Sequence, residues 1–508
     1  MPFTDNNSQL EPLLFQMKQF KNLTKTTVEI LPSSGQTAYG PNRRCIFTLP
    51  YASLISLEDL SFHFEFVPVV PVFSSTTQVP ATAPYARLLP PKDVASLISE
   101  VDIKINGQTI QHLTRYNDIV NLLNTFEQPE TAKIALQGFD PSIVYEKGPA
   151  GTWVPIERDA NGGASYNLTP YGTSGTNNNL NNLPKKYIIN HWYGLLGHRG
   201  KDVSSNFIDT NILGEVTIDF VFASASVCSL IVPTNDNIRT VCNSADATDI
   251  PSATDNTNAY SQITYSIKDP KLSMVRYNLP MSYSEAVRSA LVGGQQYKIA
   301  FNHYETHSQK AERSKGSIRW NENSRDIKAL VAYFTDTQRD TNLPQEYNKI
   351  KNTSEYFNYA NPIHAKSQFQ VGSTMMPQNK LDSADLFLEL VRGAIGVRGR
   401  NVPFGFNSHD DAHPGQTLEL WLQTCFMAYL SLEMTEGMTE LANDGKKLLS
   451  GLSSEQLPIS CVYYYDNSES HAQLGAGNPL AWEKTLNVMS ITTRMLVIEN
   501  GQNCSVDI

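Results

Sequence analysis

Runs in which apolar and polar residues alternate recur along the whole chain, and they constrain the fold more than any other feature. Between residues 60 and 66 the even positions are apolar, while His63 and Glu65 point to the other face. Residues 214–222 repeat the pattern, with apolar side chains at the even positions from Val216 onward. A period of two is the period of a β-strand with one buried face. The chain is therefore predicted to be all-β, with antiparallel sheets.

The segment VDIKINGQTI at residues 101–110 predicts a β-hairpin. Its first strand places alternate apolar residues on one face, and Asn106-Gly107 is the residue pair best suited to positive φ in a two-residue turn. The apolar residues that follow recur at the spacing of a helix, at Ile119, Leu122, Leu123 and Phe126. A short helix is therefore expected to interrupt the strands here.

The length of 508 residues predicts two domains, because a single hydrophobic core stops growing at roughly 250–300 residues. Residues 234–260 carry almost no large apolar side chains, which is typical of a linker. We therefore expect an N-terminal arm at 1–20, a first unit at 21–255 and a second unit at 256–508. Residues 161–184 are rich in Asn, Gly and Thr and predict a long exposed loop.

The second unit repeats the pattern of the first. A capping-box sequence at 282–285 predicts the start of a helix, which should stop at Gly293-Gly294, and a second helix-like segment spans 382–392. The remaining signals are those of strands, at residues 263–267, 272–277, 297–303, 327–334, 418–434, 457–465, 486–491 and 495–498. Two similar β units with helical insertions are the simplest architecture.

Charge and cysteine usage restrict the class of protein. The formal net charge of -10 argues against a chain that coats nucleic acid, because it would repel phosphate. No run approaches the roughly 20 apolar residues of a membrane-spanning helix, and the first residues lack the basic flank and apolar stretch of a signal peptide. Six scattered cysteines without a CxxC pair predict reduced core residues of a protein assembled inside a cell. They are Cys45, Cys228, Cys242, Cys425, Cys461 and Cys504.

Two pairs of histidines have spacings that occur in metal sites. His409 and His413 are separated like the ligands of a helix-borne zinc site, but Pro414 follows at once and leaves the helix no room, so we expect an acidic surface loop. His303 and His307 lack the HxH and nearby Glu of a cupin, and we expect structural roles for both.

The remaining motifs do not indicate catalysis. The glycine- and arginine-containing segment at 392–400 matches neither GxGxxG nor a P-loop, so a flexible loop is expected, with binding of an anion or of packaged nucleic acid as the alternative. No GxSxG elbow occurs, and no carboxylate pair stands out among the many acidic residues. We therefore expect no catalytic, cofactor-binding or metal-binding residues, no cofactor and no enzymatic activity.

Five segments, taken in their order along the chain, carry a resemblance. They are the hairpin at 101–110 with its helix, HWYGLLG at 191–197, NILGEVTIDFVFASA at 211–225, YSIKDPKLSMVRYNLP at 265–280 and MSYSEAVRSALVGGQQYKIAFNHYE at 281–305. Together they resemble the major capsid proteins of Sputnik-type virophages. The resemblance implies a double jelly roll, in which two consecutive eight-stranded antiparallel jelly rolls carry short helical and loop insertions.

The resemblance also implies a function and a set of partners. The chain would be a major capsid protein that forms a homotrimer, and these pseudo-hexameric capsomers would tile an icosahedral virion shell. Its contacts would be neighbouring capsomers, penton and minor capsid proteins and an internal membrane, without sequence-specific nucleic-acid binding. Assembly would take place in the host cytoplasm or a viral factory. The loop at 161–184 and segments around 340–415 would be tower or contact loops.

Two questions stay open at the level of sequence. Aromatic residues in weakly periodic segments either anchor the trimer interface or belong to the core; they are Trp192, Tyr193, Tyr356, Phe357 and Tyr359. The alternative function is that of a lectin-like or receptor-binding β-sandwich spike protein, because jelly rolls serve both purposes. Two units of similar size favour the capsid protein.

Overall fold

The computed structural model describes residues 24–51, 53–69, 87–91, 93–127, 143–147, 153–157, 184–197, 207–233, 238–240, 264–278, 281–294, 296–311, 315–337, 339, 356–357, 359, 366–381, 385–386, 426–432, 452–453, 458–464, 484–499 and 503–507. The predicted N-terminal arm, the His409–His413 segment and the Gly/Arg segment lie outside these residues. So do almost all of the loop at 161–184 and of the helix-like segment at 382–392.

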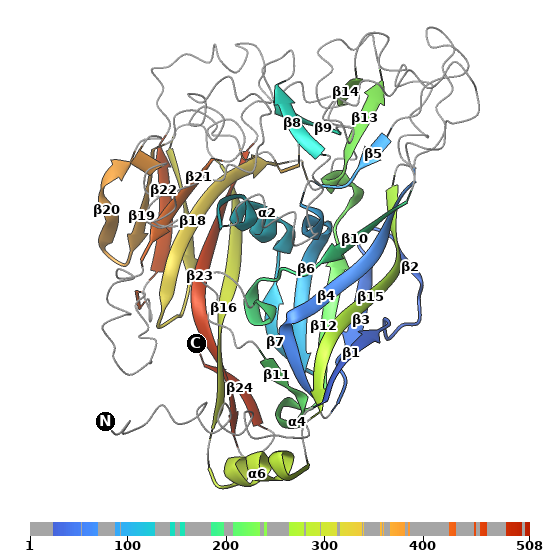
Figure 1. Cartoon of the computed structure of the whole chain (residues 1–508). Helices are drawn as coiled ribbons and strands as arrows, with labels where there is room; N and C mark the ends of the chain where they lie inside the picture. The colour runs from blue at the N-terminus through green and yellow to red at the C-terminus, as the bar shows by residue number, and fades with distance from the viewer. Residues whose placement is uncertain are drawn as a thin grey trace, which may run out of the picture.

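The first half of the chain forms two antiparallel sheets (Figure 1). The order of the first sheet is β1 (Thr24–Ile30), β15 (Thr264–Asn278), β4 (Leu54–Val69) and β10 (Lys185–Ile189). Two short strands extend it, since β2 (Ala38–Tyr39) pairs with β15 and β11 (Phe207–Asp209) pairs with β4. The order of the second sheet is β3 (Arg44–Thr48), β12 (Val216–Phe222), β6 (Ile98–Ile105) and β7 (Gln108–Leu113).

The second half forms a matching pair of antiparallel sheets. One has the order β16 (Tyr297–Lys310), β23 (Lys484–Glu499), β18 (Ile327–Asp336) and β21 (Met427–Ser431), and β24 (Asn503–Asp507) pairs with β23. The other has the order β17 (Lys315–Asn321), β22 (Pro458–Tyr464), β19 (Lys366–Val371) and β20 (Thr374–Leu381).

The two halves share one strand topology. If the main strands of each half are numbered from one to eight along the chain, one sheet has the order 1-8-3-6 and the other the order 2-7-4-5, in both halves. The pairs 1-8, 2-7, 3-6 and 4-5 are nested, as in a long antiparallel ribbon wrapped around a barrel, and this arrangement is a jelly roll. The predicted all-β fold of two consecutive eight-stranded jelly rolls is confirmed.

The strand pairing corrects the domain boundary expected near residue 255. Strand β15 pairs with β1 and β4 and is therefore the eighth strand of the first jelly roll. The change of sheet occurs across helix α6 (Met281–Val292), which precedes β16. A polar composition is typical of long connections between strands. Residues 234–260, which were expected to link the two units, lie between the seventh and eighth strands of the first jelly roll.

Short accessory elements complete the first half. Strands β5 (Arg87–Leu89), β13 (Ser229–Pro233) and β14 (Ile238–Thr240) form a small sheet, and β8 (Ile143–Lys147) pairs with β9 (Trp153–Glu157). These strands lie at the end of the molecule opposite α6 (Figure 1). Single helical turns occur at η1 (Val94–Leu97), η4 (Gly194–Leu196), α4 (Thr210–Leu213) and η5 (Ala225–Val227).

Two long strands replace predicted pairs of short ones. Residues 263–267 and 272–277 were separate in the pattern because Asp269-Pro270 breaks the alternation, but β15 continues through them with an irregular register between Lys268 and Lys271. Likewise β23 runs unbroken through Thr492 and Thr493, two buried polar residues that hide the apolar alternation.

The predicted hairpin, the helix that directly follows it and the helix predicted to stop at Gly293-Gly294 are confirmed. Asn106 and Gly107 have φ values of 49° and 81°, as the turn between β6 and β7 requires. Helix α2 (Tyr116–Glu127) follows directly and buries Ile119, Leu122 and Leu123. Helix α6 ends at Gly293-Gly294, where Gly294 has a φ of 90°.

Aromatic side chains form the centre of the first jelly roll. Phe62 of β4 lies between the sheets, with ring centroids 5.9 Å from Phe47 and 5.3 Å from Phe220, and Trp192 stacks on Phe220 at 5.2 Å. In the second jelly roll, Phe334 of β18 contacts Tyr463 of β22 at 5.6 Å. Such pairs add roughly 0.5–1.5 kcal/mol each beyond the area that they bury.

The aromatic residues considered as trimer anchors are core residues of the single chain. All five are buried: Trp192, Tyr193, Tyr356, Phe357 and Tyr359. Strand β10 ends at Ile189, and Trp192 and Tyr193 follow it inside the fold, where the Trp192 indole donates to Leu60 O at 3.0 Å. Cys45, Cys228 and Cys461 are also buried, with free thiols, as predicted for these three.

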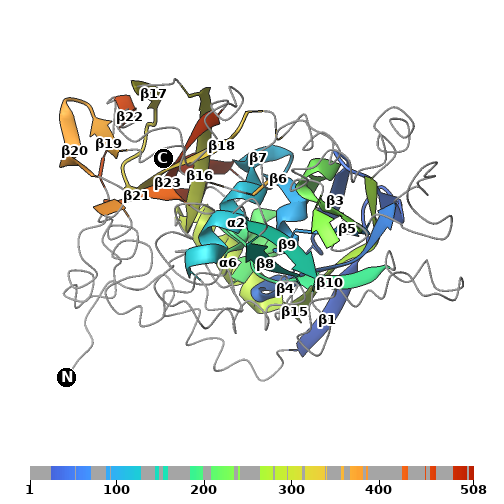
Figure 2. The ribbon, with the colours of Figure 1, turned by 90° about the horizontal axis from the view of Figure 1, so that it is seen from above.

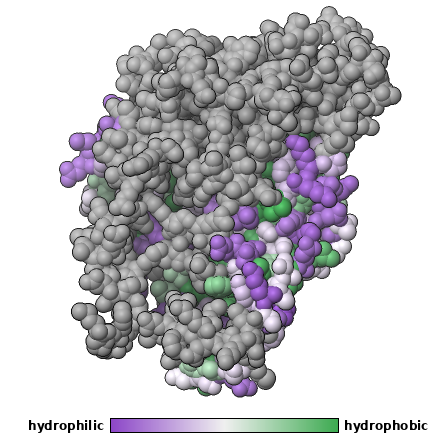
Figure 3. Space-filling view, viewed as in Figure 1, coloured by the Kyte–Doolittle hydropathy of each residue, from purple (hydrophilic) through white to green (hydrophobic). Residues whose placement is uncertain are grey.

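The described surface on the face in Figure 3 is mainly hydrophilic, with isolated hydrophobic side chains. Among the described residues, the large apolar side chains that remain exposed are scattered along the chain; they are Leu31, Ile46, Tyr51, Val69 and Val292. Among the helices that the structure describes, none has the length and apolar character needed to cross a membrane.

Candidate functional site at the junction of the two halves

Helix α2 lies between the two jelly rolls in both views (Figures 1 and 2). It belongs to the first half and contacts β18 of the second half through Asp118 and Tyr333, whereas β16 contacts β7 and η4 of the first half. On β16 the side chains alternate. Tyr304 and Thr306 contact the first half, whereas Phe301 and His303 point to the other face and are buried in the second half. One strand therefore serves both the junction and its own core.

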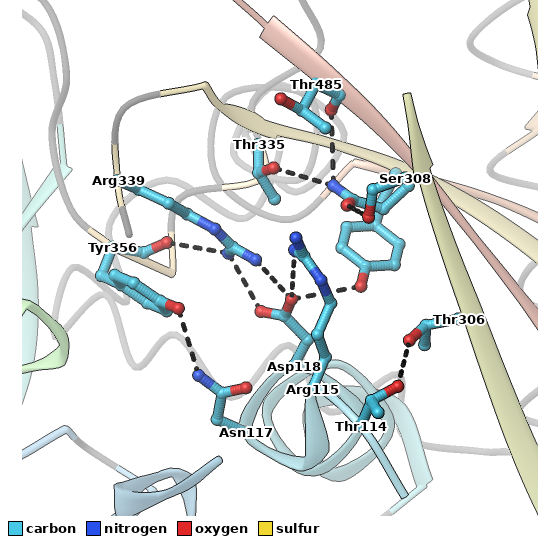
Figure 4. A network of polar contacts seen from close by, with 12 residues as sticks. Thr114, Arg115, Asn117, Asp118, Thr306, Ser308, Thr335, Arg339, Tyr356 and Thr485 are labelled. Atoms are coloured by element: carbon cyan, nitrogen blue, oxygen red, sulfur yellow. Dashed lines mark hydrogen bonds and ion pairs between the residues drawn. The ribbon is translucent and has the colours of Figure 1, made fainter. Parts of the chain in front are cut away.

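A buried ion pair joins the halves at this point (Figure 4). Asp118, in the first turn of α2, accepts hydrogen bonds from both terminal nitrogens of Arg339, and its Oδ1 lies 3.0 Å from Nη1. Tyr333 of β18 donates to Oδ2 at 3.2 Å, and Tyr359 donates to Oδ1 at 2.9 Å. The side chains of Asp118 and Arg339 are 0% and 2% exposed, so water contributes almost nothing to their solvation.

Neighbouring groups complete the surroundings of Arg339. Its Nη1 donates to Tyr356 O at 3.3 Å, and its Cζ lies 4.5 Å from the centroid of the Tyr356 ring, a cation–π distance. Asn117, beside Asp118 on α2, donates to the Tyr356 hydroxyl at 3.3 Å. The guanidinium is therefore fixed by residues from both halves.

The two charges stabilise one another. Burial by itself would raise the pKa of Asp118, but the Arg339 guanidinium, with Arg115 and the Tyr359 hydroxyl, holds that pKa below its usual value. Burial would also lower the pKa of Arg339, and Asp118 raises it well above its usual value. Both groups stay ionised, and removal of either would leave an uncompensated buried charge, which costs about 3–5 kcal/mol.

Polar and aromatic contacts extend the junction along β7 and η4. The buried Gln111 accepts a hydrogen bond from Leu195 N at 2.7 Å and donates to Asn302 O of β16 at 3.0 Å. Thr114 and Thr306 are hydrogen-bonded at 3.1 Å, and Tyr193 meets Tyr304 edge to face at 5.8 Å. A satisfied buried polar network of this kind specifies one relative placement of the halves.

His303 and His307 are on the same face of β16, but four strand residues separate them by about 13 Å. Burial, with Arg494 and His112, lowers the pKa of His303 to about 3. In the described part of the chain, one group of side chains could supply three metal ligands, and it contains Glu305, His307 and Glu322. His409 and His413 lie outside the described residues.

Sequence reasoning missed Asp118 and Arg339. Asp118 precedes the first apolar residue of α2 and was not distinguished from a solvated first-turn acid. Arg339 lies in a polar segment after β18 and shows no periodicity. Only the partner across the junction identifies either residue, and that partner is more than two hundred residues away in the sequence.

No protein-family model and no curated protein matches this sequence. Solved structures do match it. A chain of the PBCV-1 virus capsid is 10% identical, with a TM-score of 0.52, and the match covers 96% of this chain and 97% of that chain. Its crystal structure, PBCV-1 VP54 fitted into a reconstruction of the virophage Sputnik, gives 11% identity, a TM-score of 0.50 and the same coverage of both chains.

This chain has the double jelly-roll fold of viral major capsid proteins. The Sputnik virophage structure itself matches with 12% identity and a TM-score of 0.49, over 96% of this chain and 88% of that chain. The match to the PBCV-1 capsid protein extends over nearly the whole length of both chains, so the double jelly roll includes both halves and the junction between them. At the level of fold, the resemblance drawn from the sequence is confirmed.

Proposed function

We propose that this chain is a viral major capsid protein, a structural subunit and not an enzyme. Three chains would close into a pseudo-hexameric capsomer, and these capsomers would tile an icosahedral shell. The observation that carries the proposal is the repetition of one strand order, 1-8-3-6 with 2-7-4-5, in both halves of a single chain. Two equivalent barrels per subunit give six barrels in a trimer, which is the approximate symmetry that a hexagonal tile needs.

The junction supports this role physically. A hexagonal outline requires that the two barrels of a subunit keep a fixed relative placement. The buried Asp118–Arg339 pair and the Gln111 contacts restrict that placement, because a pair of buried charges tolerates little displacement before it loses its compensation. A chain whose barrels moved independently would not tile a regular shell.

The partners and location follow from the proposed role. Neighbouring capsomers, penton and minor capsid proteins would contact the outer edges of the trimer. The virion would be the site of the protein, after assembly in the host cytoplasm or a viral factory. The net charge of -10 supports the absence of direct nucleic-acid coating.

The experiment is a measurement of molar mass by light scattering on the purified full-length protein. The proposal predicts a stable species of three times the chain mass, at concentrations down to the micromolar range. A monodisperse monomer over the same concentration range would contradict the proposal and would favour the alternative of a lectin-like or receptor-binding spike protein.

A further inference from the structure

A cluster of polar side chains lies within the second jelly roll, apart from the junction. Glu305 and His307 stand on one face of β16, and Ser490 and Arg494 of β23 share that face because they pair with residues 305 and 301. Glu322, which follows β17, reaches the same place and accepts a hydrogen bond from Ser490 at 2.6 Å. Strands β16 and β23 and the end of β17 therefore bring two carboxylates and an imidazole together.

The donor atoms have the spacing of a metal site. The ligand atoms of Glu305, His307 and Glu322 all lie within 4.8 Å of one another. Glu305 Oε1 and His307 Nε2 are 3.5 Å apart, close to the separation of about 3.4 Å that two ligands of a tetrahedral zinc ion have. The buried His307 Nε2 makes no hydrogen bond in the described structure, although a buried imidazole nitrogen normally has a partner.

Arg494 and Ser490 orient the two carboxylates. Arg494 Nη2 contacts Glu305 through Oε2, at 3.3 Å, and Glu322 through Oε1, at 3.7 Å. Ser490 donates to Glu322 Oε2, and contacts of this kind orient carboxylates that bind a metal. With both glutamates ionised, the two carboxylates and Arg494 carry a net charge of -1, which a divalent cation would offset.

A second buried imidazole lies beside this cluster. His303 is 5% exposed, and its Nδ1 has no hydrogen-bond partner in the described structure. It is two residues before Glu305 on the same face of β16.

We propose that Glu305, His307 and Glu322 bind a divalent transition-metal ion, of which Zn²⁺ is the probe of choice, inside the second jelly roll. One imidazole and two carboxylates are a donor set that zinc accepts. The ion would tie β16 to the residue that follows β17, and its role would be structural. The inference does not depend on the proposed capsid function.

The test compares zinc retention by variants of the full-length protein. The protein is treated with a chelator, dialysed against ZnCl₂ and then against buffer, and its zinc content per chain is measured by mass spectrometry. The wild type should retain one zinc more per chain than His307→Gln or Glu322→Gln. The matched control is His112→Gln, which removes a histidine that pairs with Asp102 in the first half and should leave zinc retention unchanged.

Thermal unfolding supplies the second readout. Zinc should raise the Tm of the wild type and of His112→Gln, because a ligand that binds the folded state stabilises it, and should leave the Tm of His307→Gln unchanged. If His307→Gln does not fold, Glu305→Gln replaces it, since that side chain is 37% exposed. Equal zinc content and an equal Tm response in the wild type and the ligand variants would overturn the proposal.

Discussion

At the residue scale, the account depends on a few buried polar side chains that the sequence pattern does not distinguish. Asp118 and Arg339 are the clearest pair. A helix-start aspartate and an arginine in a polar segment would both be assigned to the surface from sequence, because charged residues are almost never fully buried unless they are paired. By contrast, the positive φ of Asn106 and Gly107 was predictable, since it depends on two adjacent residues alone.

The first prediction concerns the ion pair. Asp118→Asn and Arg339→Met should each lower the free energy of unfolding by about 3–5 kcal/mol, whereas the double variant should lose less, because neither charge is then left unpaired. Urea unfolding of the three variants measures this. The control is Glu29→Gln, which breaks the exposed pair with Lys271 and should have no measurable effect. Single variants that unfold like the wild type would refute the assignment.

The second prediction is a pH dependence. Because the folded-state pKa of Asp118 lies below its ordinary value of 3.8, the pair contributes its full stability above that value and loses it as the pH falls through the folded-state pKa. The Tm of the wild type should therefore fall more steeply than that of Asp118→Asn as the pH is lowered from about 4 towards the folded-state pKa. Parallel Tm curves would show that Asp118 does not carry this linkage.

At the scale of elements, alternation predicted the strands well where one face is buried and failed where polar residues are buried too. Strand β4 follows its predicted alternation from Leu60 to Phe66. Strand β23 does not follow such a pattern, because the polar residues Thr492 and Thr493 are buried within it. The sequence therefore predicted two short strands where the eighth strand of the second jelly roll is continuous. The domain boundary was placed too early along the chain because it was inferred from composition. Composition does not show to which sheet the next strand, β15, belongs.

The third prediction tests one strand on its two faces. Phe220→Asp should abolish soluble folded protein, because the charge would lie among Phe47, Phe62 and Trp192 with no partner, which costs several kcal/mol. Thr217→Asp, on the opposite face of β12, is half-buried beside Lys104 of β6 and should be tolerated. The soluble yield and the Tm of the two variants are measured. Equal yields and equal Tm values would contradict the assignment of Phe220 and Thr217 to opposite faces of β12.

At the scale of the whole molecule, the fold class followed from the sequence but the relation between the halves did not. Period-two runs and length were sufficient for two β units. The second unit repeats the first strand for strand, and this depends on pairings such as β1 with β15 and β16 with β23. Their partners lie at least 175 residues apart along the chain, the separation of Lys310 and Thr485. Only the structure shows that α2 lies between the two jelly rolls and carries the ion pair that joins them.

The measurement that tests the central claim most directly is electron microscopy of the purified protein in negative stain. A trimer of double jelly rolls places six barrels around a central axis, so the account predicts particles of hexagonal outline with threefold symmetry. Elongated two-lobed particles, the shape of a single chain with two barrels, would contradict it, as would closed rings with any symmetry other than threefold.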